Sequence, residues 1–355
     1  MQPDLREYLL KKAAIALLII MVITIPVAYL IPVAENAYYA KKEAILTQQN
    51  REREKLLSMS GTELIENANE TTEGYTLKEQ TIEFKLPLGC KGENVKVEED
   101  QKSRQCVVSL PYADENYFLD RTVTGDTSVL KDASYEYVDR VGYLTLSLDR
   151  VYEYFTEYSS DTFTISFKTP KQLYDKIVLV DAGSGGNDTG VNKYNIDEKN
   201  INLDICLKLK ELLQDVNGVG FYYTRLDDET ITDEERYEFA KDIEADLVVS
   251  IQMNHTPSGM MSTINGTQVA YKEDSEESKA LAEEIKDSIV ADLFTSDKGV
   301  KPFADDDIWK DYSGMAIIVK PGFMTNTGDL ELLSTDGARH AVAADIYKAV
   351  AALYE

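Results

Sequence analysis

Histidine and cysteine, the residues that most often hold a catalytic zinc ion, are scarce in this chain. It has two histidines, His255 and His340, and three cysteines, Cys90, Cys106 and Cys206. A zinc site of three histidines or four cysteines is therefore impossible within one chain. The chain does contain enough of these residues for a zinc site of three cysteines and one histidine. No two of the cysteines have the close C-x-x-C spacing of such sites, so we set this alternative aside.

A glycine-rich segment, DAGSGGNDTG at residues 181–190, could bring a ligand close to the main chain. It lacks the G-x-G-x-x-G spacing of a dinucleotide loop and the G-K-[ST] of a phosphate-binding loop. Ser184 would be a nucleophile only beside a base such as histidine, and the segment lacks the G-x-S-x-G pattern. The residues alone leave open whether the segment binds a ligand or only turns the chain.

Strands and helices alternate from residue 176 to the end of the chain. Continuous apolar runs predict strands at 176–181, 219–224, 245–253, 267–272 and 315–320. Helical spacing predicts helices at 198–216, 233–244, 275–294 and 336–354. This order predicts an α/β fold with a central, mainly parallel sheet and helices on both faces. Sites in such folds lie beyond the carboxyl ends of strands, which directs attention to residues 181–187, 252–255 and 320–326.

Those strand ends resemble the catalytic domain of the zinc-dependent N-acetylmuramoyl-L-alanine amidases, the bacterial cell-wall amidases. Six landmarks carry the resemblance, in the family's order, over residues 176–355. They are residues 181–186 for D-A-G-H-G-G, 198–203 for E-K-x-x-N-L, 224–225 for T-R, 235–236 for E-R, 245–254 for A-D-x-x-x-S-I-H-x-N and 319–326 for V-E-x-G-F-x-x-N. The resemblance implies an amidase-like domain at 171–355 and peptidoglycan as the substrate class.

This chain departs from the family pattern at the residues that carry out the family's chemistry. The family holds zinc through two histidines and a glutamate, and a further glutamate acts as general base. The resemblance implies Ser184 and Gln252 at the histidine positions, Glu198 as the retained glutamate ligand, and Lys320 at the base position. A neutral hydroxyl and an amide are poor zinc ligands, and a protonated lysine neither accepts a proton nor tolerates a nearby dication. We therefore expect no zinc, no other cofactor and no catalytic residue here.

The same residues, with Asn254 and Arg225, form a candidate ligand-binding pocket, and each has another interpretation. Glu198 fits a capping box that starts at Asn195, and we weigh this evenly against a role in the pocket. His255 is a low-odds substitute metal ligand. Lys320 could pair with Glu198, its ammonium standing where the metal would be. Arg225 is expected to be structural, with substrate-carboxylate binding as the weaker alternative.

Residues 76–170 show period-two alternation, as in 82–88, 144–148 and 163–167, which predicts a small antiparallel β-sandwich. Its many tyrosines favour packing over a sugar-stacking face. Cys90 and Cys106 flank an expected hairpin, and a disulfide and two free thiols both remain open. The position of this region before the amidase-like domain is like that of the β-sandwich targeting domain, AMIN type, of some cell-wall amidases.

Residues 13–34 form an uncharged run of 22 residues. A helix of that length spans about 33 Å, enough for a bilayer core. The run is longer than the apolar core of a signal peptide, and no clear A-x-A site follows it, so we expect a transmembrane anchor. Residues 1–12 form a short tail and 35–75 a helical stalk or linker. The body of the protein is expected outside the cytoplasm at the cell membrane.

A net charge of −26 argues against nucleic acid, whose phosphates require a basic face. We interpret the chain as a membrane-anchored cell-wall amidase homologue without catalytic activity, which binds peptidoglycan or a wall or division protein. One alternative is an active amidase with a rearranged metal site that uses Glu198, His255 and nearby carboxylates. Another is an envelope interaction protein that binds through the β-sandwich.

Overall fold

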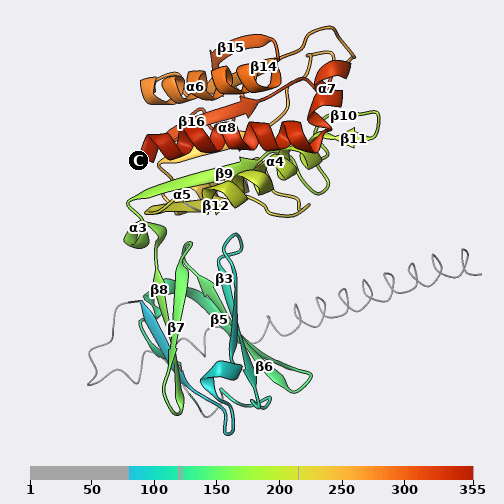
Figure 1. Ribbon diagram of the computed structural model, residues 1–355. Coiled ribbons are helices and arrows are strands. Elements are labelled where there is room, and N and C mark those ends of the chain that lie inside the picture. Colours follow the sequence, from blue (N-terminus) through green and yellow to red (C-terminus); the bar gives the residue numbers. More distant parts are fainter. Residues whose placement is uncertain (1–79, 119–120, 122, 215, 355) are drawn as a thin grey trace, which may run out of the picture. The chain divides into compact units, whose positions relative to one another are not determined.

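The computed structural model describes residues 80–118, 121, 123–214 and 216–354 (Figure 1). The expected tail, transmembrane segment and stalk at residues 1–75 lie outside this range. Among the described residues, no helix combines the length and apolar character needed to cross a membrane. All described residues fall in one compact unit, Leu64–Glu355.

Residues 81–168 fold into antiparallel sheets. Within the described residues there are two four-stranded sheets, ordered β4-β1-β8-β7 and β2-β3-β6-β5. Their strands are β1 Thr81–Lys85, β2 Lys96–Asp100, β3 Gln105–Pro111, β4 Thr124–Gly125, β5 Leu130–Val138, β6 Val141–Leu148, β7 Glu153–Tyr158 and β8 Thr162–Lys168, with short 3-10 helices at Gly92–Asn94 and Thr127–Val129. Alternate residues of β3, β6 and β8 are buried, and they share one apolar core. The alternation therefore gives each sheet an inner and an outer face.

Tyrosine and cysteine side chains of this region contribute mainly to packing. Tyr152 is buried, and the Tyr135 and Tyr154 hydroxyls donate to the carbonyls of Asp114 and Val97. Cys90 and Cys106 are buried as free thiols, which answers the disulfide question left open by their spacing. Burial raises the pKa of the Cys106 thiol to about 12, so this sulfur is a packing group rather than a nucleophile.

A mixed sheet forms the centre of the second half of the chain. In the described part its order is β12-β9-β13-β16-β14-β15, with one antiparallel pairing, between β16 and β14. The strands are β9 Lys176–Ala182, β12 Val219–Tyr223, β13 Leu247–Ile251, β14 Thr267–Tyr271, β15 Asp297–Pro302 and β16 Met315–Lys320. The predicted α/β fold is confirmed, although the direction of β14 and β15 makes the sheet mixed.

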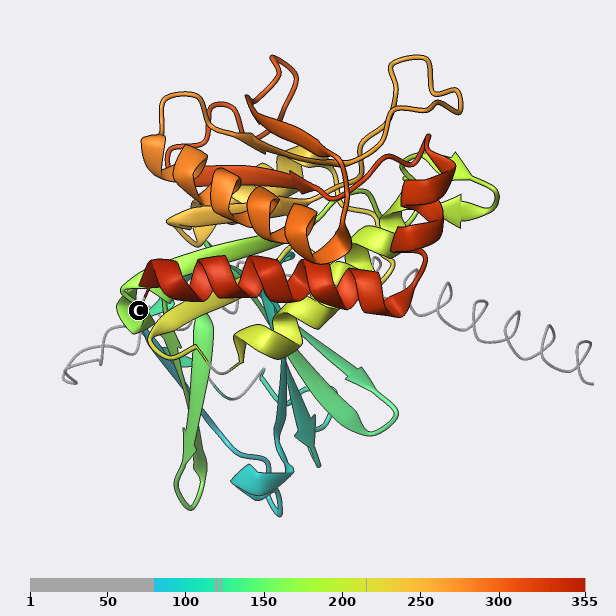
Figure 2. The same cartoon turned by 45° about the horizontal axis from the view of Figure 1, so that its top comes forward.

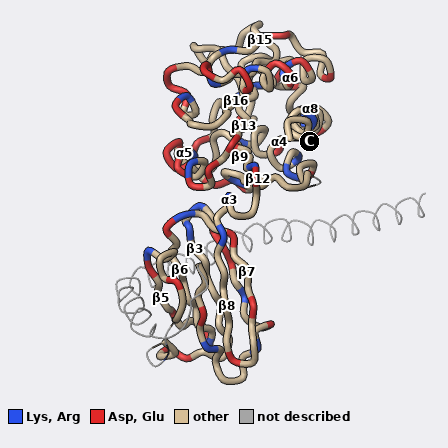
Figure 3. The backbone as a smooth tube through the Cα atoms, turned by 90° about the vertical axis from the view of Figure 1, so that its left-hand side faces the viewer, with Lys and Arg blue, Asp and Glu red and all other residues tan. Residues whose placement is uncertain are grey.

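Helices cover both faces of this sheet, as predicted. The helices are α3 Pro170–Leu173, α4 Glu198–Leu213, α5 Asp233–Asp242, α6 Glu276–Leu293, α7 Thr327–Leu333 and α8 Asp336–Tyr354. On one face α8 packs between α4 and α6 over an aliphatic core (Figure 2). The other face packs against α5 and the buried side chains of Trp309 and Tyr312. Acidic residues occupy much of α5, in keeping with a solvated outer side (Figure 3).

Several small elements were not predicted, among them the short helix α3. A two-stranded hairpin pairs β10, Asn192–Lys193, with β11, Ile196–Asp197. The strand β15 and the helix α7 lie in segments that carry no apolar period. These elements form where neighbours supply the packing, which is a tertiary effect that local sequence does not encode.

Candidate functional site

Three strand ends meet at one edge of the mixed sheet, as the parallel order requires. Ile251 of β13 pairs with Ala182 of β9 and with Val319 of β16. The Gly183 N–H donates to the Ile251 carbonyl at 2.9 Å, and the Gln252 N–H to the Val319 carbonyl at 3.1 Å. Four of the predicted site residues follow or end these strands, and the fifth begins α4. We call them the strand-end cluster: Ser184, Glu198, Gln252, Asn254 and Lys320.

Glu198 is the first residue of α4, and its carboxylate is buried and hydrogen-bonded through both oxygens. One oxygen accepts from the Met253 N–H at 2.8 Å and the other from the Val191 N–H at 3.0 Å. The predicted capping box is wrong, because the N-cap is Asp197 and Asn195 lies in the β10–β11 turn with φ of 63°. Glu198 instead ties the start of α4 to the end of β13.

Ser184 lies beside Glu198 in an unusual conformation. Its φ is 58°, in the left-handed region that only a few non-glycine residues occupy. A Cβ added at Gly190 would lie 2.9 Å from the Ser184 Oγ and 2.8 Å from a Glu198 oxygen, so Gly190 leaves room where these two groups converge. The Ser184 carbonyl accepts from the Arg236 guanidinium at 2.7 Å, which fixes the turn from behind.

Gln252, Asn254 and Lys320 supply polar groups to the same edge. The Gln252 Nε2 donates weakly to the Ser250 hydroxyl at 3.3 Å, and the Asn254 Nδ2 donates to Gln268 Oε1 at 3.3 Å. Lys320 is half-buried. The hypothetical ion pair between Lys320 and Glu198 is not formed, and the Glu198 oxygens accept from main-chain N–H groups.

Arg225 belongs to the framework under the cluster. Its buried guanidinium donates to the carbonyls of Ala182, Gly183, Lys199 and Asp227. Burial, and then the neighbouring Arg236, lower the pKa of Arg225. A guanidinium held by four carbonyls does not reach a substrate carboxylate, so the structural interpretation is the one the contacts support.

Sequence reasoning did not identify two ion pairs near the glycine turn, a buried one between Asp181 and Arg236 and one between the buried Lys199 and the exposed Asp228. Asp181 accepts from Arg236 and from the Thr224 and Ser250 hydroxyls beneath the turn. Lys199 donates to the Gly186 carbonyl at 2.8 Å and to Asp228 at 2.7 Å. The bonds from Lys199 and from the Gly186 N–H lower the pKa of Asp228. Asp181, Lys199 and Arg236 all lie within the family landmarks, and that position could have indicated that these charged residues have a structural role.

The donors of the strand-end cluster do not fit a zinc ion. Glu198 offers the one carboxylate, with both oxygens already bonded, beside a hydroxyl, an amide and an ammonium. No group of three or more His, Cys, Asp or Glu side chains within the described residues could hold a metal ion. His255 belongs to no such group, and its Nδ1 lies 3.0 Å from the Thr256 carbonyl. Zinc chemistry prefers imidazole, thiolate or free carboxylate.

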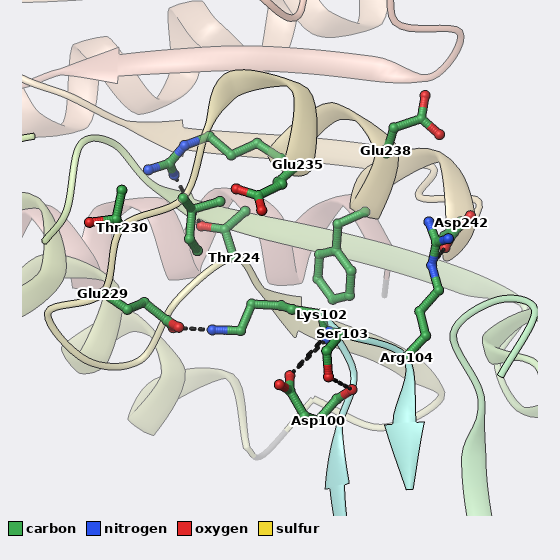
Figure 4. Close-up of a pocket in the computed structure, with 13 residues that line it drawn as sticks. Asp100, Lys102, Ser103, Arg104, Thr224, Glu229, Thr230, Glu235, Glu238 and Asp242 are labelled. Carbon is green, nitrogen blue, oxygen red and sulfur yellow. Dashed lines mark hydrogen bonds and ion pairs between the residues drawn. The ribbon is translucent and has the colours of Figure 1, made fainter. Parts of the chain in front are cut away.

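A separate cavity of about 400 Å³ lies beside α5 (Figure 4). Residues 100–104 of the β2–β3 turn line one side, and residues of α5 and the loop at 229–231 line the other. Its cations are already paired, Lys102 with Glu229 and Arg104 with Asp242. Because these lining cations and carboxylates neutralise one another, the side chains of this cavity do not indicate which ligand would bind there.

Comparison with known proteins identifies the family to which the second half of the chain is similar. A family model described as N-acetylmuramoyl-L-alanine amidase matches residues 178–352. The uncharacterized protein YqiI of Bacillus subtilis is 34% identical over 184 residues, which are 51% of this chain and 85% of YqiI. The N-acetylmuramoyl-L-alanine amidase LytC of B. subtilis is 31% identical over 201 residues, 55% of this chain and 39% of LytC.

One solved structure is reported for comparison. The crystal structure of N-acetylmuramoyl-L-alanine amidase from Clostridium difficile 630 is 28% identical, with a TM-score of 0.46. The match covers 49% of this chain and 94% of that chain.

Proposed function

Because this chain belongs, through residues 178–352, to the N-acetylmuramoyl-L-alanine amidase family, we propose that it is a cell-wall amidase homologue without a catalytic metal centre. Its work is then to bind peptidoglycan or a protein of the wall or division machinery. The observation that carries this proposal is the donor set at the strand ends, where Ser184, Gln252 and Lys320 accompany Glu198, whose two oxygens each accept from a main-chain N–H.

The chemistry of these four groups opposes metal-assisted hydrolysis. A hydrolytic zinc site needs three good ligands and an open position for water. Ser184 and Gln252 offer neutral oxygens, which are weak zinc ligands beside imidazole, so Glu198 is the one carboxylate among the four groups. The protonated Lys320 cannot act as a base toward water. A pocket with these groups recognises a ligand by hydrogen bonds and charge.

The location of the protein is part of the proposal. Residues 13–34 form the membrane anchor, and the body lies on the outer side of the cell membrane, within reach of peptidoglycan. The uncharged apolar run supports the anchor, and membership of a cell-wall family supports the outer location.

The test measures zinc content and release of stem peptide from sacculi, with the purified full chain and a restored variant, Ser184→His, Gln252→His and Lys320→Glu. We expect sub-stoichiometric zinc and no peptide release for the wild type, but sedimentation with sacculi or with a wall protein. The restored variant should gain zinc, since histidine tolerates the left-handed conformation at position 184 better than most residues.

Stoichiometric zinc in the wild type, or release of stem peptide by it, would instead support the alternative of an active amidase with a rearranged site. Sedimentation by a chain whose strand-end cluster has been replaced would support the second alternative, binding through residues 76–170.

A further inference from the structure

One row of side chains crosses the edge of the mixed sheet next to the glycine turn. Gln268 of β14 pairs directly with Lys320 of β16. On the other side of Lys320, the register of β16 and β13 places Gln252 next in line, and Gly183 follows β9 beyond it. Residues paired across strands project from the same face, so Lys320 lies between two carboxamides.

Gly183 contributes space to this row. A Cβ at position 183 would lie 2.8 Å from the Gln252 Cγ and 3.0 Å from the Ile251 carbonyl. Its lack of a side chain lets Gln252 lie over the turn. The Gln252 amide is anchored by the Ser250 hydroxyl, and the Gln268 amide by Asn254.

The ammonium of Lys320 has no acidic partner. Within the described residues it forms no ion pair, in contrast to the buried Lys199 and Lys286, which each pair with an aspartate. The half-buried Lys193, Lys210, Lys272 and Lys298 likewise form no ion pair among the described residues, so the neighbours of Lys320 are what set it apart. The nearest acids in sequence and register are already used. Asp181 is bonded to Arg236, and Asp329 accepts from the Gly266 and Phe323 N–H groups. A half-buried cation without a protein counter-ion can bind an anion where hydrogen-bond donors lie beside it, and Lys320 is flanked by the Gln252 and Gln268 amides.

We propose that Lys320, between Gln252 and Gln268, binds a carboxylate of the peptidoglycan stem peptide. This inference rests on the proposed function, because it names the ligand group that the strand-end cluster recognises. Lys320 supplies the charge, and the amide nitrogens of Gln252 and Asn254 are donors on the same edge. The position that the family uses for a base thus becomes a position that holds an anion.

The experiment measures binding of a disaccharide tetrapeptide from peptidoglycan to the full chain by calorimetry. The probe is used with free carboxylates and with its carboxylates converted to methyl amides. Variants are Lys320→Gln, Lys320→Arg and the control Lys272→Gln. Lys272 is also half-buried, but it follows β14 at the opposite edge of the same sheet.

We expect the free probe to bind about tenfold or more tightly than its amidated form, as the loss of a charged hydrogen bond requires. Lys320→Gln should weaken the free probe by a similar factor without affecting the amidated probe. Lys320→Arg should retain binding, and Lys272→Gln should be neutral. Inorganic phosphate at the probe concentration should not compete.

Different negative results would overturn different claims, either the carboxylate assignment alone or also the binding of peptidoglycan. Binding of both probe forms with equal affinity, or unchanged binding by Lys320→Gln, would overturn the carboxylate assignment and leave peptidoglycan binding intact. Competition by phosphate would show a general anion site and would also overturn it. No binding of either form would overturn both this inference and peptidoglycan recognition by the strand-end cluster.

Discussion

Glu198 shows how a single retained residue can keep its position while its oxygens serve the fold. Replacing it by Gln puts an amide NH₂ against one of two buried main-chain N–H donors. We expect Glu198→Gln to lower the free energy of unfolding by about 1–3 kcal/mol, the cost of leaving a buried donor unsatisfied. Urea denaturation followed by circular dichroism measures this change.

Glu276→Gln is the matched control, because Glu276 is also the first residue of a helix, α6, but is exposed. It should lose only the helix-dipole term, about 0.5 kcal/mol. Equal destabilisation by the two variants would contradict the role assigned to the buried carboxylate.

The sequence predicted which residues gather at the strand ends better than it predicted their contacts. The apolar runs pointed to three strand ends, and the family resemblance selected Ser184, Gln252 and Lys320 among the residues there; the strand order that brings them to one edge comes from the structure. The partners of Glu198 and Lys320 depend on where main-chain N–H groups of distant loops arrive. The capping-box pattern at Asn195 therefore predicted the wrong helix start, because Asn195 lies in a hairpin turn and has a positive φ.

The glycine turn is an element in which a missing Cβ creates the site. Gly190 has φ of 61°, and an added Cβ would approach both Glu198 and Ser184 within 3 Å. Gly190→Ala should cost the backbone strain of about 1–2 kcal/mol and a steric term in addition. Thermal and urea unfolding of the variant measure the sum.

The variant Gly259→Ala separates the cost of backbone strain from the cost of the steric clash. Gly259 has nearly the same φ, 67°, and nothing lies within 4 Å of its added Cβ. It should show the backbone strain alone, so Gly190→Ala is expected to be at least about 1 kcal/mol more destabilising. Identical losses would show that the turn relaxes and that Gly190 is not a spacer.

The strand β2 carries a carboxyl group whose titration depends on packing. Burial first, and the charge of Glu153 second, raise the pKa of Glu99 from 4.5 to about 7. The folded state therefore holds this proton more tightly than the unfolded state. Its contribution to stability is complete below pH 4.5 and is lost as the pH rises through 7.

Glu99→Gln should remove that pH dependence. After allowance for solvent screening, we expect the wild type to lose about 1–2 kcal/mol relative to the variant between pH 4.5 and pH 8. Urea midpoints across this range provide the measurement. Glu98→Gln, at the exposed neighbouring position, should keep the wild-type slope, and a wild type without any slope would refute the assignment.

Elements with a strong period were predicted well, and elements without one were missed. The buried strands β9, β13 and β16 and the long helices α4, α6 and α8 each carry their own apolar pattern. The strand β15, DKGVKP, has almost none, and it forms because β14 offers a free edge. Edge pairing of this kind is decided by the sheet, so local sequence reasoning cannot find it.

At the scale of the whole molecule, composition excludes more than it specifies. A net charge of −26 is consistent with a well-solvated surface and opposes nucleic-acid binding, but it does not indicate which ligand the protein binds. The two His residues limited the zinc chemistry before any fold was known. Identity of the ligand depends instead on a few side chains at one sheet edge, which composition cannot resolve.

The proposed anchor makes a prediction for the intact chain. Each lysine at the centre of a spanning helix costs about 2.5–3.5 kcal/mol of insertion free energy, so Ile19→Lys with Ile20→Lys should release the protein from membranes. The same charges at Thr47 and Gln48, outside the apolar run, should leave it membrane-bound. Carbonate-washed membrane fractions separate the outcomes. If the Ile19 and Ile20 variant stayed with the membrane, residues 13–34 would not be what holds the protein there, and the amidase-like domain would need another route to the wall.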